Sequence, residues 1–191
     1  MNNETAIEIL EMLELSPNHK NTALNLLAEA DSKYLRDLKL NIKAALKSDT
    51  LSDKEIALMG VAIATNAVNN PLLEYFVSLS EKNEATKEEI ADAAACASLL
   101  SSNNVLYRFR HFANKEKYNK LPARLRMNIM RNPVLGKEFF ELVSLAVSAV
   151  NGCEMCVNSH EKSLIALGTS EERVFDSIRI ASVFTSVSKM V

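Results

Sequence analysis

Two cysteines and a histidine stand at spacings that suit redox chemistry. Cys153 and Cys156 are three residues apart, and His160 follows Cys156 by four residues. Residues three or four apart share one face of a helix. The two sulfurs can therefore join in a disulfide, and the imidazole can take a proton from Cys156 directly or through one water. This spacing favours thiol–disulfide exchange.

The residues before the cysteine pair predict how it is placed. Asn151 and Gly152 interrupt an apolar segment, so a new helix should begin near Cys153. Free N–H groups and the helix dipole at such a start stabilise a thiolate. Glu141 lies near the start of the preceding apolar helix. Burial there should raise the pKa of the Glu141 carboxyl and make it a base near neutral pH.

Zinc binding is the main alternative role for this cysteine pair. Cys153, Cys156 and His160 would supply three ligands, whereas a structural zinc site needs four. The sequence contains no second CxxC or CxxH pair to complete such a site. A redox pair is therefore favoured over a metal site. The remaining cysteine, Cys96, is expected to be a small buried residue in an alanine-rich helix.

Composition favours an all-α protein with a sizeable core. The chain has 191 residues, 48% of them hydrophobic, but only 4 Gly, 4 Pro and no Trp. The net charge of −2 and the absence of long charge runs argue against nucleic acid or an anionic membrane as partner. No signal sequence is recognisable, and the apolar segment 58–68 is too short to span a bilayer. We expect a cytoplasmic protein.

Periodicity and capping signals predict the helices that must position the site. Capping boxes at Ser52/Glu55 and Thr86/Glu89 mark two helix starts, and Ser16 with Pro17 marks another. Besides the helix at Cys153, we predict helices over residues 4–15, 17–28, 32–45, 55–68, 71–79, 90–100, 142–150 and 172–190.

Short matches between the two halves of the chain predict an internal duplication. Residues 38–42 match 125–129, Glu55 matches Glu141, and residues 86–89 match 169–172. We predict one compact domain made of an N-terminal helical extension (1–31), a first helical repeat (32–120) and a second repeat with the cysteine pair (121–191). In this alignment the counterparts of Cys153, Cys156 and His160 are Ala67, Asn70 and Glu74. The scaffold is therefore repeated without its chemistry.

The combination of Glu141, Cys153, Cys156 and His160 resembles the AhpD alkyl hydroperoxide reductase family, within the carboxymuconolactone decarboxylase-like superfamily. The segments 121–130 and 103–108 also match. The resemblance extends roughly from Tyr34 to the C-terminus. It implies an all-α fold with two diverged helical repeats, and a homotrimer.

The resemblance also implies an activity and residue roles. Members are antioxidant enzymes that reduce the peroxiredoxin AhpC and have weak peroxidase activity toward alkyl hydroperoxides. They bind no cofactor, and dihydrolipoamide on a lipoylated 2-oxoacid dehydrogenase component is the expected electron donor. In this chain Cys156 would be the attacking sulfur and Cys153 the resolving one, with Glu141 and His160 as the proton relay.

Two features depart from the family pattern, and two other functions stay open. Many members carry a histidine directly before the second cysteine, where this chain has Met155, and they lack the extension 1–31. One alternative function is a decarboxylase acting on a lactone acid, although that chemistry does not need paired cysteines. The other is a redox-sensing or zinc-binding module without enzymatic activity.

Overall fold

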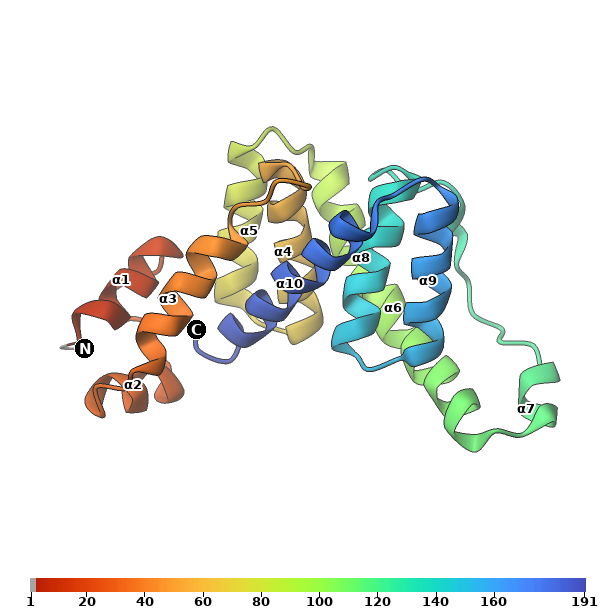
Figure 1. Cartoon of the computed structure of the whole chain (residues 1–191), viewed down its shortest axis with the longest axis horizontal. Helices are drawn as coiled ribbons and strands as arrows, with labels where there is room; N and C mark the ends of the chain where they lie inside the picture. The colour runs from red at the N-terminus through yellow and green to blue at the C-terminus, as the bar shows by residue number, and fades with distance from the viewer. Residues whose placement is uncertain (1–2) are drawn as a thin grey trace.

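Helices form the whole regular secondary structure of residues 3–191, the part of the chain described by this computed structural model (Figure 1). Within that part there is no strand, so the predicted all-α fold is confirmed. Met1 and Asn2, where the predicted extension begins, lie outside the described residues. The helices are α1 (Glu4–Met12), α2 (Thr22–Glu29), α3 (Tyr34–Ala45), α4 (Asp53–Ala67), α5 (Asn70–Lys82), α6 (Lys87–Ala113), α7 (Glu116–Lys120), the 3-10 helix η1 (Asn128–Arg131), α8 (Lys137–Val150), α9 (Glu154–Ala166) and α10 (Glu171–Val187).

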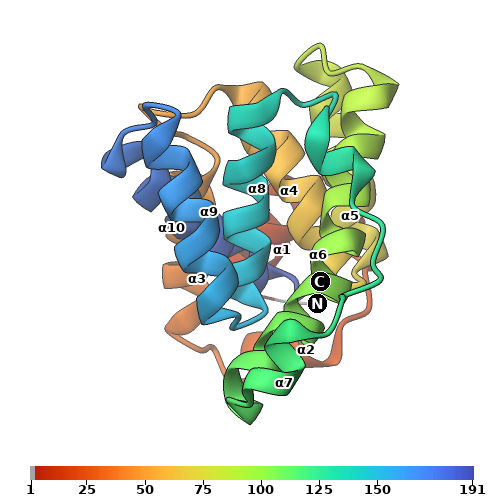
Figure 2. The same ribbon diagram turned by 90° about the vertical axis from the view of Figure 1, so that its right-hand side faces the viewer.

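Helices α4 and α8 lie at the centre of the molecule. Every residue from Ile56 to Ala64 and from Phe139 to Ser148 is buried, which is expected for helices that are apolar on most sides. Helices α5, α6 and α10 pack on α4, while α9, α6 and α10 pack on α8 (Figure 2). None of the helices within residues 3–191 is long and apolar enough to cross a membrane.

The N-terminal helices lie at the opposite end of the molecule from α9. Helix α1 packs on α3, and α3 packs on α10 (Figure 1). The predicted helix start at Ser16 and Pro17 is wrong. These residues form a turn in which the His19 N–H donates to the Ser16 carbonyl, and Asn21 caps α2 instead. The segment 3–31 therefore covers α3 rather than the cysteine pair.

Helix α6 is much longer than the predicted 90–100. It continues to Ala113 through Asn103 and Asn104, two residues of low helix propensity. Both are buried, so packing against the rest of the molecule overrides their local preference. The matched segments 38–42 and 125–129 also differ: the first is helical, whereas the second leads into η1 from an extended loop.

One arginine joins the starts of the two central helices. Arg173 of α10 bonds Glu55 of α4 at 2.5 Å and Glu138 of α8 at 2.9 Å, and it also donates to the Thr50 carbonyl. These contacts raise the pKa of the Arg173 guanidinium. The role of Glu55 therefore corresponds to that of Glu138, not of Glu141 as the matched segments suggested.

Helix starts reveal a constant register between two helical hairpins, the first made of α4 and α5 and the second of α8 and α9. The N-caps of α4, α5 and α6 are Ser52, Asn69 and Thr86; those of α8, α9 and α10 are Gly136, Cys153 and Ser170. Each pair is 84 residues apart (136 − 52, 153 − 69 and 170 − 86). In this register the counterparts of Cys153, Cys156 and His160 are Asn69, Leu72 and Phe76. The matched segments had given Ala67, Asn70 and Glu74 instead. The repeat boundaries themselves stay a prediction.

Candidate active site

The turn between α8 and α9 brings Cys153 to the start of a helix. Gly152, with φ of +68°, donates its N–H to the Ala149 carbonyl, and Cys153 donates to the Ser148 carbonyl. This pattern is a Schellman motif, which ends α8 at a residue in the left-handed region. Cys153 is at the same time the N-cap of α9, and Cys156 lies in the first turn of that helix. The predicted helix start is confirmed.

Side-chain amides hold this turn in place. The Asn151 amide nitrogen donates to Asn104 of α6 at 2.9 Å and to Asn66 of α4 at 3.1 Å. Arg108 of α6 donates to the Asn151 carbonyl at 2.5 Å. Sequence patterns do not mark Asn66, Asn104 or Arg108 as positioning residues, because their role depends on which helices meet at the turn.

The two predicted redox cysteines are joined. Cys153 and Cys156 form a disulfide, with their Cα atoms 5.3 Å apart. Cys153 is completely buried, whereas Cys156 is 7% exposed and lines a cavity. Cys156 is therefore the sulfur that a substrate in this cavity meets first.

Glu141 and His160 form a buried hydrogen-bonded pair. Glu141 Oε2 lies 2.7 Å from His160 Nδ1, and Lys137 Nζ donates to Glu141 Oε1 at 2.9 Å. Burial raises the pKa of the Glu141 carboxyl, but the bonds from His160 and Lys137 outweigh it and hold the pKa below the ordinary 4.5. The predicted rise in the pKa of Glu141 is wrong, because the buried carboxylate has two hydrogen-bond partners, His160 and Lys137. Glu141 is a carboxylate at neutral pH.

The charge of Glu141 fixes the orientation of His160. A carboxylate only accepts hydrogen bonds, so in neutral His160 the proton sits on Nδ1. The lone pair is then on Nε2, which is free to accept a proton. Glu141 thus orients and polarises the imidazole of His160.

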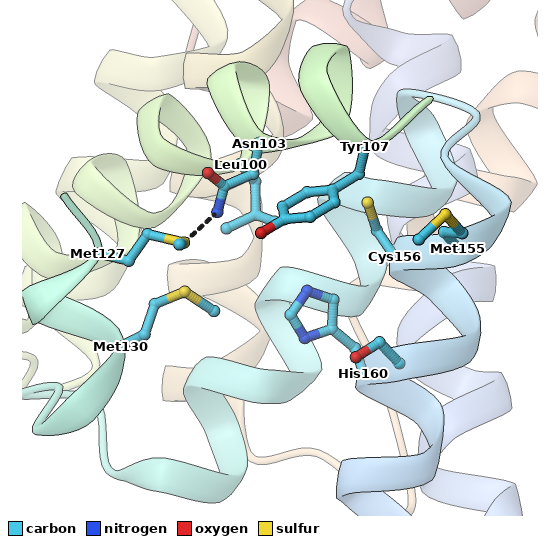
Figure 3. Close-up of a pocket in the computed structure, with 9 residues that line it drawn as sticks. Leu100, Asn103, Tyr107, Met127, Met130, Met155, Cys156 and His160 are labelled. Carbon is cyan, nitrogen blue, oxygen red and sulfur yellow. Dashed lines mark hydrogen bonds between the residues drawn. The ribbon is translucent and has the colours of Figure 1, made fainter. Parts of the chain in front are cut away.

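A cavity of about 270 Å³ lies between α6, α9 and the segment before α8 (Figure 3). Cys156 and His160 both point into it from α9. Met155, at the position where the resembled family often has a histidine, also lines it and is 42% exposed. The full lining comprises Leu100, Asn103, Tyr107, Met127, Met130, Met155, Cys156, Ser159 and His160.

Cys96 lies outside this cavity. It is buried, its sulfur is 3.4 Å from Ser144 Oγ, and burial raises the pKa of its thiol to about 12. The prediction of a small buried residue is confirmed. Within residues 3–191, no group of three or more His, Cys, Asp and Glu side chains is arranged to hold a metal ion.

The all-α fold and the paired cysteines beside a Glu–His pair define an oxidoreductase class built on helical hairpins. Residues 116–191 match the model of the carboxymuconolactone decarboxylase family. The sequence also resembles two proteins named alkyl hydroperoxide reductase AhpD. Each is 39–45% identical to this chain, over more than four fifths of this chain and of its own length. That of Anaeromyxobacter dehalogenans (strain 2CP-1 / ATCC BAA-258) is 45% identical over 84% of this chain and 86% of its own. That of Coxiella burnetii (strain RSA 493 / Nine Mile phase I) is 39% identical over 82% and 90%.

A third relative of the same name extends the match. The protein of Rhodopseudomonas palustris (strain BisB18) is 37% identical over 87% of this chain and 91% of its own length. Such identity over nearly whole chains is decisive. This chain belongs to the AhpD family, and the resemblance seen in the sequence is confirmed.

Proposed function

We propose that this chain is a disulfide reductase that regenerates the peroxiredoxin AhpC, with weak activity of its own toward alkyl hydroperoxides. The observation that carries the proposal is the Cys153–Cys156 disulfide at the start of α9, with only Cys156 facing the cavity that His160 also lines. The names of the relatives support the class of reaction.

Thiol exchange uses the two cysteines in sequence. In the reduced pair, His160 Nε2 takes the proton of Cys156, and the thiolate is stabilised by the free N–H groups of the first turn of α9. The Cys156 thiolate attacks the AhpC disulfide, forming a mixed disulfide and releasing one AhpC thiolate. Cys153 then attacks Cys156 Sγ and releases the second. Two electrons pass to AhpC, and the Cys153–Cys156 disulfide is restored.

Two further reactions complete the proposed cycle. A dihydrolipoyl dithiol attacks the Cys153–Cys156 disulfide, becomes a cyclic disulfide and leaves both cysteines reduced. Alternatively, an alkyl hydroperoxide transfers its terminal oxygen to the Cys156 thiolate and leaves as the alcohol. Cys153 then displaces water from the resulting sulfenic acid. The dihydrolipoyl group belongs to a lipoylated dehydrogenase component, which we propose as the second partner.

The proposal also covers the assembly and location. We place the protein in the cytoplasm as a homotrimer that binds no cofactor of its own. Three large apolar side chains on the outer part of α6 support a subunit contact: Val105 is 61% exposed, Phe109 50% and Phe112 74%. Side chains of this kind exposed along one helix are typical of interaction surfaces.

The decisive test is Cys156→Ser, assayed for AhpC reduction and for alkyl hydroperoxide turnover. Both rates should fall about 10³-fold or more, because the attacking sulfur is removed. Cys96→Ala is the matched control and should keep wild-type rates, since Cys96 lies outside the cavity. Wild-type peroxide turnover by Cys156→Ser would contradict the scheme.

A further inference from the structure

Two neighbouring asparagines of α6 are both buried but differ in their hydrogen bonds. Asn104 is 1% exposed; its amide nitrogen donates to Ser148 Oγ at 3.0 Å, and its carbonyl accepts from Asn151 at 2.9 Å. Asn103 is 4% exposed, and its amide nitrogen donates to Met127 Sδ at 3.3 Å. The Asn103 carbonyl oxygen has no hydrogen-bond partner within residues 3–191.

The bonding of Asn103 is poor at both ends of its amide. A thioether sulfur is a weak acceptor, and a buried carbonyl without a partner destabilises the folded state. Native proteins rarely leave such a group in place without a use for it. Asn103 lines the cavity that contains Cys156 (Figure 3). Its carbonyl oxygen is covered in this conformation, and rotation of the amide about χ2, a soft torsion in Asn, would turn it toward a bound ligand.

The cavity separates a reactive end from a polar end. Cys156 approaches from α9, and Asn103 lies on the far side of Tyr107 from it, next to Met127 (Figure 3). Leu100, Met127 and Met130 supply apolar surface around Asn103. A fitting ligand has a sulfur group at one end, an apolar chain and a hydrogen-bonding group further along.

We propose that Asn103 binds the carboxamide of a dihydrolipoamide arm while the dithiol of that arm reaches Cys156. This inference rests on the proposed function and adds the residue that recognises the electron donor. The carboxamide N–H donates to Asn103 Oδ1, and its carbonyl accepts the second proton of Asn103 Nδ2. The flexible thioethers of Met127 and Met130 adapt to the chain of the ligand.

The size of the cavity agrees with a slender ligand. Its volume of about 270 Å³ is close to the lower end of the range for small-molecule sites, which is roughly 300–1,000 Å³. One aliphatic chain with a small ring fits such a space. Asn103 is thus a substrate-binding residue, whereas Asn104 holds the turn before Cys153.

The test compares two reductants of the Cys153–Cys156 disulfide in the full chain. Dihydrolipoamide carries the carboxamide, and 1,3-propanedithiol keeps the 1,3-spacing of the two thiols but lacks the aliphatic chain and the carboxamide. Because the sequence has no Trp, reduction is followed by rapid quenching, alkylation and mass spectrometry. Asn103→Leu should slow dihydrolipoamide about tenfold, mainly through KM, the effect of losing one or two hydrogen bonds. The rate with 1,3-propanedithiol should not change.

A substrate change tests the same contact without a protein variant. The methyl ester of dihydrolipoic acid keeps the carbonyl but lacks the N–H, so wild type should use it several-fold less well than dihydrolipoamide. Thermal unfolding supplies a further readout. Asn103→Leu should keep or raise Tm because it removes an unpaired carbonyl, and Asn104→Leu should lower Tm because Ser148 and Asn151 lose their partner.

The outcomes separate this inference from the proposed function. An equal loss with both dithiols, or no loss with dihydrolipoamide, would overturn the role of Asn103. Equal rates for the amide and the ester in wild type would do the same. Failure of wild type to be reduced by dihydrolipoamide, while 1,3-propanedithiol still works, would remove both the proposed electron donor and its recognition.

Discussion

The two helical hairpins use one backbone design for opposite purposes. In each, a Schellman motif ends the central helix and the next residue occupies the N-cap position of the following helix, Asn69 in the first hairpin and Cys153 in the second. The residue in the left-handed region is Val68 in one and Gly152 in the other. The backbone of this turn therefore does not by itself create a redox site.

Side chains at corresponding positions decide between core and cavity. In the register of 84 residues set by the N-caps, His160 corresponds to Phe76, Cys156 to Leu72 and Glu141 to Ala57. Phe76 packs on Phe184 of α10, with ring centres 4.5 Å apart. In the second hairpin, His160 lines a cavity instead. The candidate site is thus a core position in which apolar groups are replaced by polar and reactive ones.

The largest expected effect comes from giving the second hairpin the side chain of the first. His160→Phe should lower AhpC-dependent turnover by about 10²- to 10⁴-fold, because the proposed base is lost. It should also destabilise the protein, since Phe76 packs directly on Gly60 and the counterpart of Gly60 is Ser144. Steady-state rates and urea unfolding measure the two effects.

Adding Ser144→Gly separates packing from chemistry. The double variant should recover part of the stability lost by His160→Phe, because the Phe ring then has the space that Gly60 gives Phe76. Its turnover should stay low. Recovery of turnover in the double variant would show that His160 serves packing and not proton transfer.

The converse change should break the first hairpin. A Cβ atom at Gly60 would lie 2.2 Å from the Phe76 ring, which is buried and cannot move freely. Gly60→Ser should therefore destabilise the protein by about 1–3 kcal/mol, the usual cost of overpacking. Chemical denaturation measures this change. An unchanged free energy of unfolding in Gly60→Ser would refute the close approach of the Phe76 ring to Gly60.

The charge of Glu141 should make stability depend on pH. Because its pKa is lowered in the folded protein, the Glu141 contacts stabilise fully above the ordinary pKa of 4.5 and are lost as pH falls through the folded value. Glu141→Gln should lower the free energy of unfolding by about 1 kcal/mol at pH 7, which is the difference between charged and neutral hydrogen bonds. The gap to wild type should close in acid. A gap that widens below pH 4.5 would contradict the assignment.

The smallest expected effects concern the two turns. Val68 has φ of +56° and is 86% exposed, so Val68→Gly should raise the free energy of unfolding by about 0.5–1 kcal/mol through relief of backbone strain. Gly152→Ala should lower it by about 1 kcal/mol, although a Cβ there meets no atom within 4 Å. Opposite signs in thermal melts would support the equivalence of the turns, and equal signs would count against it.

Much of the local structure was predictable because its signals are short-range. The capping boxes at Ser52 and Thr86 form as predicted, and Asn151-Gly152 ends α8 one residue before Cys153. Errors arose where a long-range contact overrides local preference. Helix α6 passes through Asn103 and Asn104 because both are buried. The start of α2 differs for a local reason: Ser16 takes part in a turn, and Asn21 caps the helix.

Residue types and spacings were enough to predict the helical class, the cysteine pair and the family, because these depend on composition and on positions close together along the chain. Packing of α8 against α9 was needed to bring His160 to Glu141, whereas Lys137 lies four residues before Glu141 on the same helix. Tertiary structure also decided the register of the two hairpins and the unpaired carbonyl of Asn103. A pKa and an unmet hydrogen bond depend on which atoms are neighbours in space, and that is fixed only when helices distant in the chain pack together.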